Sequence, residues 1–236
     1  MSTLVAPSAD LRSGMSELSL LAINLTRRCN LACVHCYLDA DTLRGGSPDE
    51  LRTEEVKGVL NQVAARDSGT MVVLTGGEPL ARRDLETIIA HGVRRGLAMV
   101  VGSNGTLLTR RRVRSLRDAG ALGIGISIDS LDGDYHDRFR GLPGAWEKTM
   151  AGIENCRREG LDFQIHFSIG DANAHELPAM IAFCRATGAR VLNVFFLVCT
   201  GRGEAMSDIS PQHYEEVLHE LVETQARYPD LIIRAR

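Results

Sequence analysis

Residues 71–101 read MVVLTGGEPLARRDLETIIAHGVRRGLAMVV and contain one complete strand–helix–strand unit. Met71–Leu74 and Ala98–Val101 are short apolar, β-branched runs of the kind that form buried strands. Arg83–Arg95 lies between them with apolar residues at helical spacing, and Gly96 follows as a helix stop. A helix that connects two strands in this way is typical of a parallel sheet, so the stretch predicts an α/β fold.

The same alternation extends along almost the whole chain and predicts six strand–helix units. The expected strands are Leu20–Leu25, Met71–Leu74, Ala98–Val101, Gly123–Ile128, Phe163–Ile169 and Val191–Leu197. The expected helices are Thr53–Arg66, Arg83–Arg95, Thr109–Ala119, Ala145–Glu159, His175–Thr187 and Pro211–Tyr228. Six units are fewer than the eight of a closed barrel, so the array forms either a partial (β/α)6 TIM-like barrel or an open doubly wound sheet. In both folds ligands bind beyond the carboxyl ends of the strands.

The chain is expected to form one domain with short additions at its ends. We assign residues 1–19 to an N-terminal extension and 20–210 to the core barrel. Residues 211–236 are expected to hold the last barrel helix and the start of a truncated C-terminal extension, because Leu231–Arg234 resembles the beginning of another extended element. Asp41–Glu50 and Leu131–Gly144 are expected to be loops on the functional face.

Composition argues against nucleic acid and membranes as partners. The 236 residues include 27 basic and 30 acidic side chains, for a net charge of -3, so no global field favours nucleic acid or an anionic membrane. The first 20 residues lack the pattern of a signal peptide. The longest apolar run, Val191–Val198, is far shorter than the roughly 20 residues of a spanning helix. We therefore expect a cytoplasmic protein without a membrane span.

Three of the six cysteines lie within eight residues, directly after the first strand. The sequence Thr26-Arg27-Arg28-Cys29-Asn30-Leu31-Ala32-Cys33-Val34-His35-Cys36-Tyr37 has the spacing C-x3-C-x2-C. A compact loop of this kind can wrap around an iron-sulfur cubane and hold three of its irons, which leaves one iron open to a chelating amino acid.

Two other metal sites remain open at this point. An ordinary electron-transfer cluster or a zinc site would need a fourth ligand, such as Cys199 or His35. Zinc sites usually add a second pair of ligands far from the first, and no such pair is present. We interpret His35 as a solvated or packing side chain, and Cys156, Cys184 and Cys199 as small buried hydrophobes.

Short polar motifs follow the later strands and would share the same edge of the sheet. Thr75-Gly76-Gly77-Glu78-Pro79 follows the second strand, where the glycines let the backbone approach a ligand or simply form a turn. Ser103-Asn104-Gly105 and Ser127-Ile128-Asp129-Ser130 end the next two strands and suit either ligand binding or helix capping. Arg140 suits a carboxylate by its planar guanidinium, or it is a solvated loop arginine.

Together, these motifs resemble the radical S-adenosylmethionine (radical SAM) superfamily from about Leu20 to about Gly203. The resemblance implies that Cys29, Cys33 and Cys36 hold a [4Fe-4S] cluster and that Tyr37 flanks the adenine of S-adenosylmethionine. It also implies that the GGEP motif contacts the amino group of S-adenosylmethionine. The implied cofactor-binding residues are Tyr37, Gly76, Gly77, Glu78, Pro79, Ser103, Asn104, Ser127, Asp129 and Arg140.

The resemblance further implies the reaction and the partners. A one-electron donor such as flavodoxin or ferredoxin would reduce the cluster, and S-adenosylmethionine would be cleaved to a 5'-deoxyadenosyl radical that abstracts hydrogen from a substrate carbon. No general acid or base is assigned, so the catalytic side chains stay unknown. In detail, the sequence resembles those of the SPASM or twitch subgroup of radical SAM enzymes. The auxiliary iron-sulfur clusters of that subgroup would lie in a missing C-terminal region.

Four functions therefore stay open. The stretch Leu197–Gly203 resembles heme-pathway enzymes that modify tetrapyrrole side chains, and modification of a ribosomal peptide is the alternative within the family. A non-catalytic iron-sulfur electron carrier or sensor, or a zinc-stabilised binding module, is the alternative of another class.

Overall fold

A computed structural model describes residues 18–42, 49–206 and 209–235, in which seven parallel strands form one sheet. The sheet has the order β1-β4-β5-β6-β7-β8-β9, and every neighbouring pair is parallel. Its strands are β1 (Leu20–Asn24), β4 (Met71–Thr75), β5 (Ala98–Ser103), β6 (Gly123–Ser127), β7 (Phe163–Ile169), β8 (Val191–Phe196) and β9 (Ile232–Ala235). Two short strands, β2 (Arg28–Cys29) and β3 (Asp41–Thr42), pair with each other beside this sheet.

Helices connect successive strands of the sheet. The α-helices are α1 (Thr53–Arg66), α2 (Leu85–Arg94), α3 (Arg110–Asp118), α4 (Gly133–Arg140), α5 (Ala145–Glu159), α6 (Leu177–Thr187) and α7 (Pro211–Arg227). Short 3-10 turns are η1 (Pro79–Ala81), η2 (Ala174–Glu176) and η3 (Gly201–Ala205).

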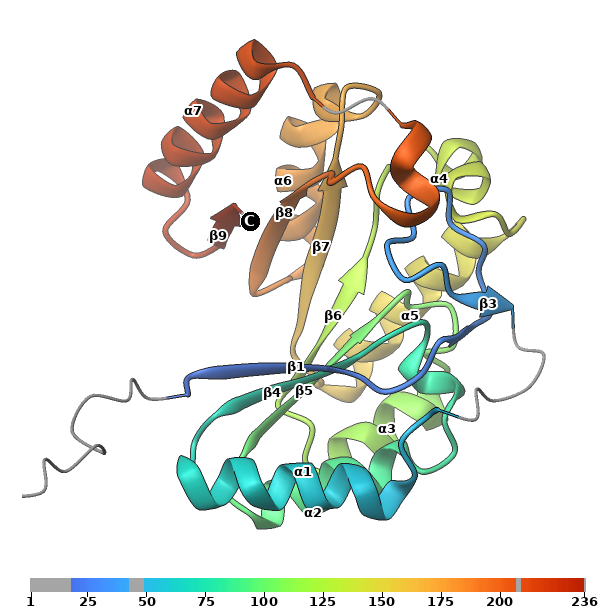
Figure 1. Cartoon of the computed structure of the whole chain (residues 1–236). Helices are drawn as coiled ribbons and strands as arrows, with labels where there is room; N and C mark the ends of the chain where they lie inside the picture. Colours follow the sequence, from blue (N-terminus) through green and yellow to red (C-terminus); the bar gives the residue numbers. More distant parts are fainter. Residues whose placement is uncertain (1–17, 43–48, 207–208, 236) are drawn as a thin grey trace, which may run out of the picture.

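The strand order separates the two folds that the sequence left open. A doubly wound sheet reverses its order at a switch point, whereas this sheet adds each strand beside the previous one. Right-handed crossovers in one direction place their helices on one face, and the sheet curls around its other face (Figure 1). The predicted partial barrel is therefore confirmed.

Burial along each strand identifies the two faces of the curled sheet. In β7, Ile165 and Phe167 are completely buried in the core, whereas their neighbours Gln164 and His166 are half-buried. Because side chains alternate along a strand, the first pair faces the helices and the second pair faces the concave side. The register of the paired strands carries this assignment from strand to strand.

All six predicted strands are present, and the extended element expected at Leu231–Arg234 is β9. The expected loop Leu131–Gly144 is wrong in part, since it contains the helix α4. Asp132 caps this helix by accepting a hydrogen bond from the Tyr135 backbone N–H at 3.0 Å, and Gly141 ends it in a left-handed conformation with φ of 67°. Helix α4 carries few apolar residues, so its periodicity was hidden.

Two other expectations concern residues that lie partly outside the described ranges. Of the predicted loop Asp41–Glu50, residues 43–48 lie outside them. The N-terminal extension 1–19 also falls almost wholly outside them, and the division at residue 210 stays a prediction.

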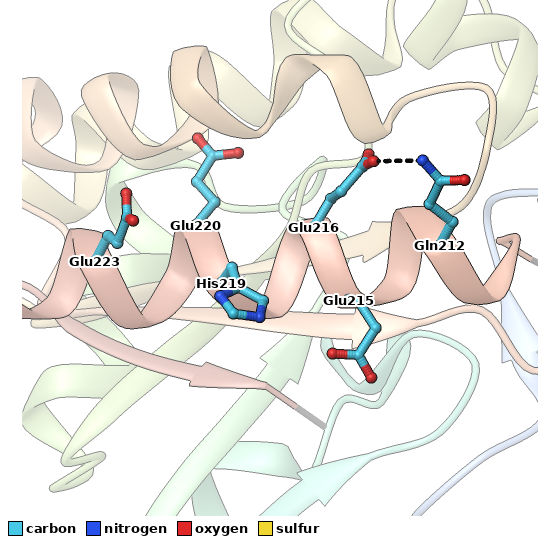
Figure 2. A pocket seen from close by; sticks show the side chains of 6 residues that line it. All are labelled: Gln212, Glu215, Glu216, His219, Glu220 and Glu223. Carbon is cyan, nitrogen blue, oxygen red and sulfur yellow. Dashed lines mark hydrogen bonds between the residues drawn. The ribbon is translucent and has the colours of Figure 1, made fainter.

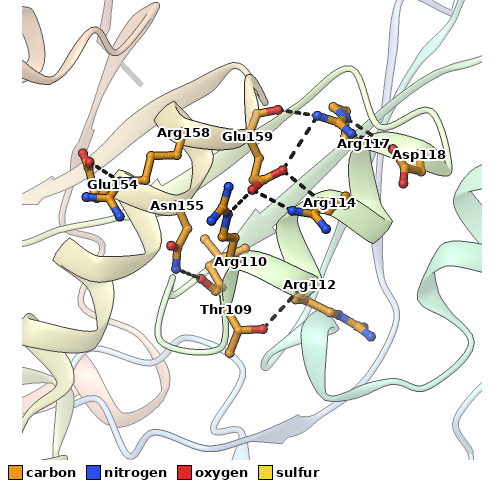
Figure 3. A network of polar contacts seen from close by, with 11 residues as sticks. Thr109, Arg110, Arg112, Arg114, Arg117, Asp118, Glu154, Asn155, Arg158 and Glu159 are labelled. Atoms are coloured by element: carbon orange, nitrogen blue, oxygen red, sulfur yellow. Dashed lines mark hydrogen bonds and ion pairs between the residues drawn. The ribbon is translucent and has the colours of Figure 1, made fainter.

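An ion-pair network fastens α3 to α5 on the outer side of the barrel (Figure 3). Glu159 at the end of α5 accepts hydrogen bonds from Arg110 and Arg114, and Arg117 donates to the Glu159 backbone carbonyl at 2.7 Å. The three arginine side chains remain 43 to 63% exposed. The network therefore lies at the surface, with only the carboxylate covered.

One side of α7 is strongly acidic (Figure 2). A wide hollow of about 630 Å³ lies against it, and Figure 2 shows its lining residues Gln212, Glu215, Glu216, His219, Glu220 and Glu223. None of them belongs to a strand end. Within the described ranges, no helix has both the length and the apolar character needed to cross a bilayer.

Candidate functional site

The cysteine loop runs from the end of β1 towards α1 and lies at the carboxyl ends of the strands (Figure 1). Cys29 and Cys33 are buried, and Cys36 is half-buried. They share a small apolar cluster with residues of the same loop, with Leu142 between α4 and α5, and with the first residue of α5: Leu31, Leu38, Ala40, Leu142 and Ala145. The loop thus brings its three thiols into one place.

Each of the three sulfur atoms accepts a hydrogen bond. The Leu31 N–H lies 3.4 Å from Cys29 Sγ, and the Ala40 N–H lies 3.4 Å from Cys36 Sγ. Arg140 Nη1 lies 3.8 Å from Cys33 Sγ. Donors aimed at sulfur stabilise thiolates, which is the form that binds iron.

Burial of the cysteines, in contrast, disfavours the charged thiolate form. It raises the pKa of Cys29 to about 11 and also raises the pKa of Cys33. A cation bound to the sulfurs lowers such a pKa, so the donor set suits a metal cluster better than free thiolates. In the described part of the chain, no three His, Cys, Asp or Glu side chains are grouped so as to hold one metal ion. A cubane places each thiolate on a different iron, which is a wider arrangement.

The first of three contacts that hold the loop comes from the motif after β4. The Gly77 N–H donates to the Thr26 carbonyl at 2.7 Å, and the Glu78 N–H donates to the Arg28 carbonyl at 2.8 Å. A Cβ on Gly77 would lie 2.8 Å from the Arg28 carbonyl carbon. The glycine therefore allows the cysteine loop to approach this backbone closely.

The second contact comes from the end of α4. The Ala32 N–H donates to the Arg140 carbonyl at 3.1 Å, and the Val34 N–H donates to the Phe139 carbonyl at 3.0 Å. A Cβ on Gly141 would lie 2.7 Å from the Ala32 carbonyl oxygen. The helix that the sequence analysis missed thus supports the middle of the loop.

The third contact comes from η3, after β8. Arg202 Nε donates to the Cys33 carbonyl at 2.9 Å, and its Nη1 donates to the Ala40 carbonyl at 2.9 Å and to Asp39 Oδ1 at 3.0 Å. The Arg202 N–H also donates to the Cys36 carbonyl at 3.1 Å. One arginine therefore ties together both halves of the loop. The sequence predicted that Arg202 lies at the barrel mouth, but it did not predict these contacts.

Glu78 is completely buried and has three partners at the rim. Its carboxylate accepts hydrogen bonds from Ser103 Oγ at 2.9 Å, from the Asn104 N–H at 2.8 Å and from the Leu80 N–H at 2.9 Å. Burial nevertheless raises its pKa to about 7. Pro79, buried beside it, begins η1. Asn104 Nδ2 lies 3.9 Å from Cys29 Sγ, so this group reaches the cysteine loop.

Asp129 and Arg140 form a buried pair next to Cys33. Asp129 Oδ2 and Arg140 Nη2 are 2.6 Å apart, without hydrogen-bond alignment, and both side chains are buried. Burial would raise the pKa of Asp129, yet Arg140 and two histidines hold it below its ordinary value. The sequence predicted that both residues bind the cofactor, which stays a prediction, and the structure shows in addition that they contact each other.

Two histidines complete this buried group. His35 Nε2 lies 3.9 Å from Asp129 Oδ2, and the His35 ring stacks on Phe139 with centroids 4.5 Å apart. Burial lowers the pKa of His35 and of His136 to about 4. The packing interpretation of His35 is confirmed, and His136 was missed because it belongs to α4. Within the described ranges, most of the buried side-chain nitrogens and oxygens without a hydrogen-bond partner belong to this group.

The other predicted cofactor residues lie at the same rim. Tyr37 is 62% exposed, and its hydroxyl donates to Asn24 Oδ1 at 3.2 Å. Ser127 is half-buried at the end of β6 on the concave face. Gly76 precedes Gly77 with φ of 132°. The structure thus gathers every predicted site residue at one edge, while their contacts with S-adenosylmethionine stay a prediction.

A family model described as "Radical SAM superfamily" matches residues 23–184. The chain belongs to the radical SAM superfamily. It is 41% identical over 211 residues to a protein of Methanosarcina barkeri (strain Fusaro / DSM 804) named "AdoMet-dependent heme synthase", which covers 87% of this chain and 58% of that protein. It is 32% identical to a second protein of the same organism, "Fe-coproporphyrin III synthase", over 92% of this chain and 54% of that protein.

The radical SAM fold is also the fold of its structural neighbours. Streptococcus suis SuiB, solved bound to S-adenosylmethionine, superposes with a TM-score of 0.78 at 15% identity and covers 92% of this chain and 50% of that chain. The chain spans little more than half the length of the curated relatives that it matches.

The remaining cysteines are not part of the radical SAM loop. Cys156 and Cys184 are completely buried in the core, as expected of small hydrophobes. Cys199 is half-buried, and its thiol donates to the Met206 carbonyl at 3.2 Å.

Proposed function

We propose that this chain is the catalytic core of a radical SAM enzyme that modifies tetrapyrrole side chains in heme biosynthesis. The observation that carries the proposal is the cysteine loop, whose three thiols each accept a hydrogen bond at the carboxyl edge of the barrel. The similarity to heme-pathway relatives supports the substrate class.

Cys29, Cys33 and Cys36 would hold a [4Fe-4S] cluster. When bound, this cluster supplies the electron that cleaves S-adenosylmethionine and yields the 5'-deoxyadenosyl radical. A flavodoxin or ferredoxin would deliver the electron. The chain's own contribution is to orient the ligands and to exclude water, and the three contacts from β4, α4 and β8 fix the loop for that purpose.

The rim residues offer complementary groups to an amino acid ligand. Glu78, with Ser103 and Asn104 around it, is placed to attract an ammonium group. Arg140 has a buried guanidinium with nitrogens outside any hydrogen bond, and it would turn one of them towards a carboxylate. Tyr37 would flank the adenine, and Ser127 and Asp129 would lie near the ribose.

Auxiliary clusters and location complete the proposal. The three cysteines outside the loop do not lie together as a second ligand group, so auxiliary iron-sulfur clusters would need cysteines from outside these 236 residues. We propose a cytoplasmic location.

Anaerobic reconstitution followed by dithionite reduction tests the function. We expect about four irons per chain, an electron paramagnetic resonance signal that S-adenosylmethionine alters, and formation of 5'-deoxyadenosine. Cys29→Ala, Cys33→Ala and Cys36→Ala should each abolish product, whereas Cys199→Ala should retain it. A cluster that S-adenosylmethionine does not perturb would identify an electron carrier or sensor, and stoichiometric zinc in a colourless protein would identify a binding module.

A further inference from the structure

One row of the concave face is polar across four neighbouring strands. The register pairs Ser127 of β6 with His166 of β7, His166 with Asn193 of β8, and Asn193 with Arg234 of β9. Because paired residues of parallel strands point to the same side, all four side chains share the concave face. Adjacent strands are about 4.8 Å apart, so the row extends over roughly 14 Å.

Neighbouring side chains hold the central members of this row. Asn193 donates to Gln164 Oε1 at 2.9 Å and is almost completely buried. The His166 ring stands over Gly125, where a Cβ would collide with it, and its centroid lies 5.3 Å from that of Phe195. The glycine in β6 therefore makes room for the imidazole on the concave face.

The charge on this face favours an anion. Arg234 is exposed and, in the described part of the chain, has no acidic side chain within ion-pair distance. The strand positions that face the concave side contain no Asp or Glu in β1 and β4 to β9. The nearest buried carboxylate, Asp129 beyond the end of β6, is already paired with Arg140, so a carboxylate that reaches the row would meet hydrogen-bond donors and the Arg234 cation.

The facing strands complete an amphipathic surface. On the same face, β1, β4 and β5 present apolar side chains before the strands end in the polar Asn24 and Thr75: Leu20, Ala22, Met71, Val73, Ala98 and Val100. A flat apolar ring system with carboxylates along one edge matches such a surface, since the ring covers the apolar strands while the carboxylates reach the donors.

We propose that His166, Asn193 and Arg234, the part of this row that lies beyond the cofactor residue Ser127, bind the carboxylate groups of the tetrapyrrole substrate. This inference rests on the proposed function and names the part of the site that selects its substrate.

Binding of coproporphyrin III to the full chain tests the proposal by its absorption and fluorescence. Arg234→Gln should weaken binding about tenfold, because a charge-assisted hydrogen bond is lost. Asn193→Asp should weaken it further by placing a like charge in the row. Arg227→Gln, the same change on the exposed side of α7, should leave binding unchanged. The tetramethyl ester, which lacks the charges, should bind more weakly and be insensitive to Arg234→Gln.

Two results would overturn the row as a carboxylate site: equal binding by Arg234→Gln and Arg227→Gln, or an ester that binds as tightly as the acid. Circular dichroism of each variant checks folding, and Arg234 is exposed, so its replacement leaves the core intact. Formation of 5'-deoxyadenosine by the wild type without porphyrin binding rejects this inference and leaves radical chemistry in place. Binding that depends on Arg234 without 5'-deoxyadenosine rejects the radical function instead.

Discussion

The strand-end site and the outer helical layer each contain a covered carboxylate with arginine around it, and the two are built differently. Asp129 at the site is completely buried and contacts one arginine that is buried as well. Glu159 on the outer layer is held by three arginines whose side chains remain largely in water. Both carboxylates have a pKa below the ordinary value.

The difference lies in how completely the hydrogen bonds are made. Arg110 and Arg114 are hydrogen-bonded to the Glu159 carboxylate, which leaves a satisfied structural contact. Arg140 Nε and Nη2 and Asp129 Oδ2 are buried without an aligned partner. Unsatisfied buried groups are costly, so a protein retains them where another role requires them. The inner pair is thus the one prepared for a ligand.

Replacement of the inner carboxylate should have the largest effect. Asp129→Asn leaves the Arg140 guanidinium buried without a counter-charge, so the free energy of unfolding should fall by about 3 to 5 kcal/mol. Urea unfolding of the cluster-free protein, followed by circular dichroism, measures this change.

A double variant separates stability from function at the same pair. Asp129→Asn combined with Arg140→Met removes both charges and should recover most of the stability, because a buried ion pair is worth little against an apolar replacement. It should not recover formation of 5'-deoxyadenosine. A double variant that is as unstable as Asp129→Asn alone would show that the pair's charges are not the cause.

Replacement of one glycine at the strand-end site and one in the outer helical layer gives a second comparison of the two regions. Gly77→Ala pushes a methyl group against the Arg28 backbone and should cost about 1 to 3 kcal/mol, with loss of iron on reconstitution. Gly58→Ala, in α1, meets no atom within 4 Å and should stabilise the protein by about 0.5 to 1 kcal/mol. Iron content and urea unfolding of both variants measure the contrast. Equal iron content would mean that the loop tolerates displacement.

Replacement of the outer carboxylate should have the smallest effect. Arg114 and Arg110 lower the pKa of Glu159 to about 2 from its ordinary value of 4.5. A depressed folded-state pKa stabilises the protein above pH 4.5, and this contribution is lost as the pH falls towards 2. Between about pH 5 and about pH 3, Glu159→Gln should therefore lose less stability than the wild type. Parallel pH dependences would refute this assignment, and at neutral pH 5'-deoxyadenosine formation should be unchanged.

The sequence predicted what depends on local pattern. Strand and helix periodicity, with glycines such as Gly160 and Gly188 at helix ends, located six strands and six helices, and the cysteine spacing located the loop. Helix α4 escaped because its apolar residues are too few to show a stripe, although Asp132 and Gly141 already carried the cap signals.

The sequence could not predict what depends on chain segments that meet only after folding. The pairing of Asp129 with Arg140 joins a strand end to a helix end, and the contacts of Arg202 join the last unit to the first loop. Gly77 illustrates the limit well. Its small size was predicted to matter for the approach of a ligand, and the structure adds a close approach of the cysteine loop that local pattern did not indicate.

The contact from Arg202 sets an order of events during synthesis. The cysteines leave the ribosome early, whereas the residues of η3 that tie down the Cys33 and Cys36 carbonyls follow only after five further strands of the sheet. A nascent chain therefore carries the loop without its final anchor while those five strands are synthesised. Cluster insertion should follow completion of η3, and a chain cut before that turn should fail to retain iron.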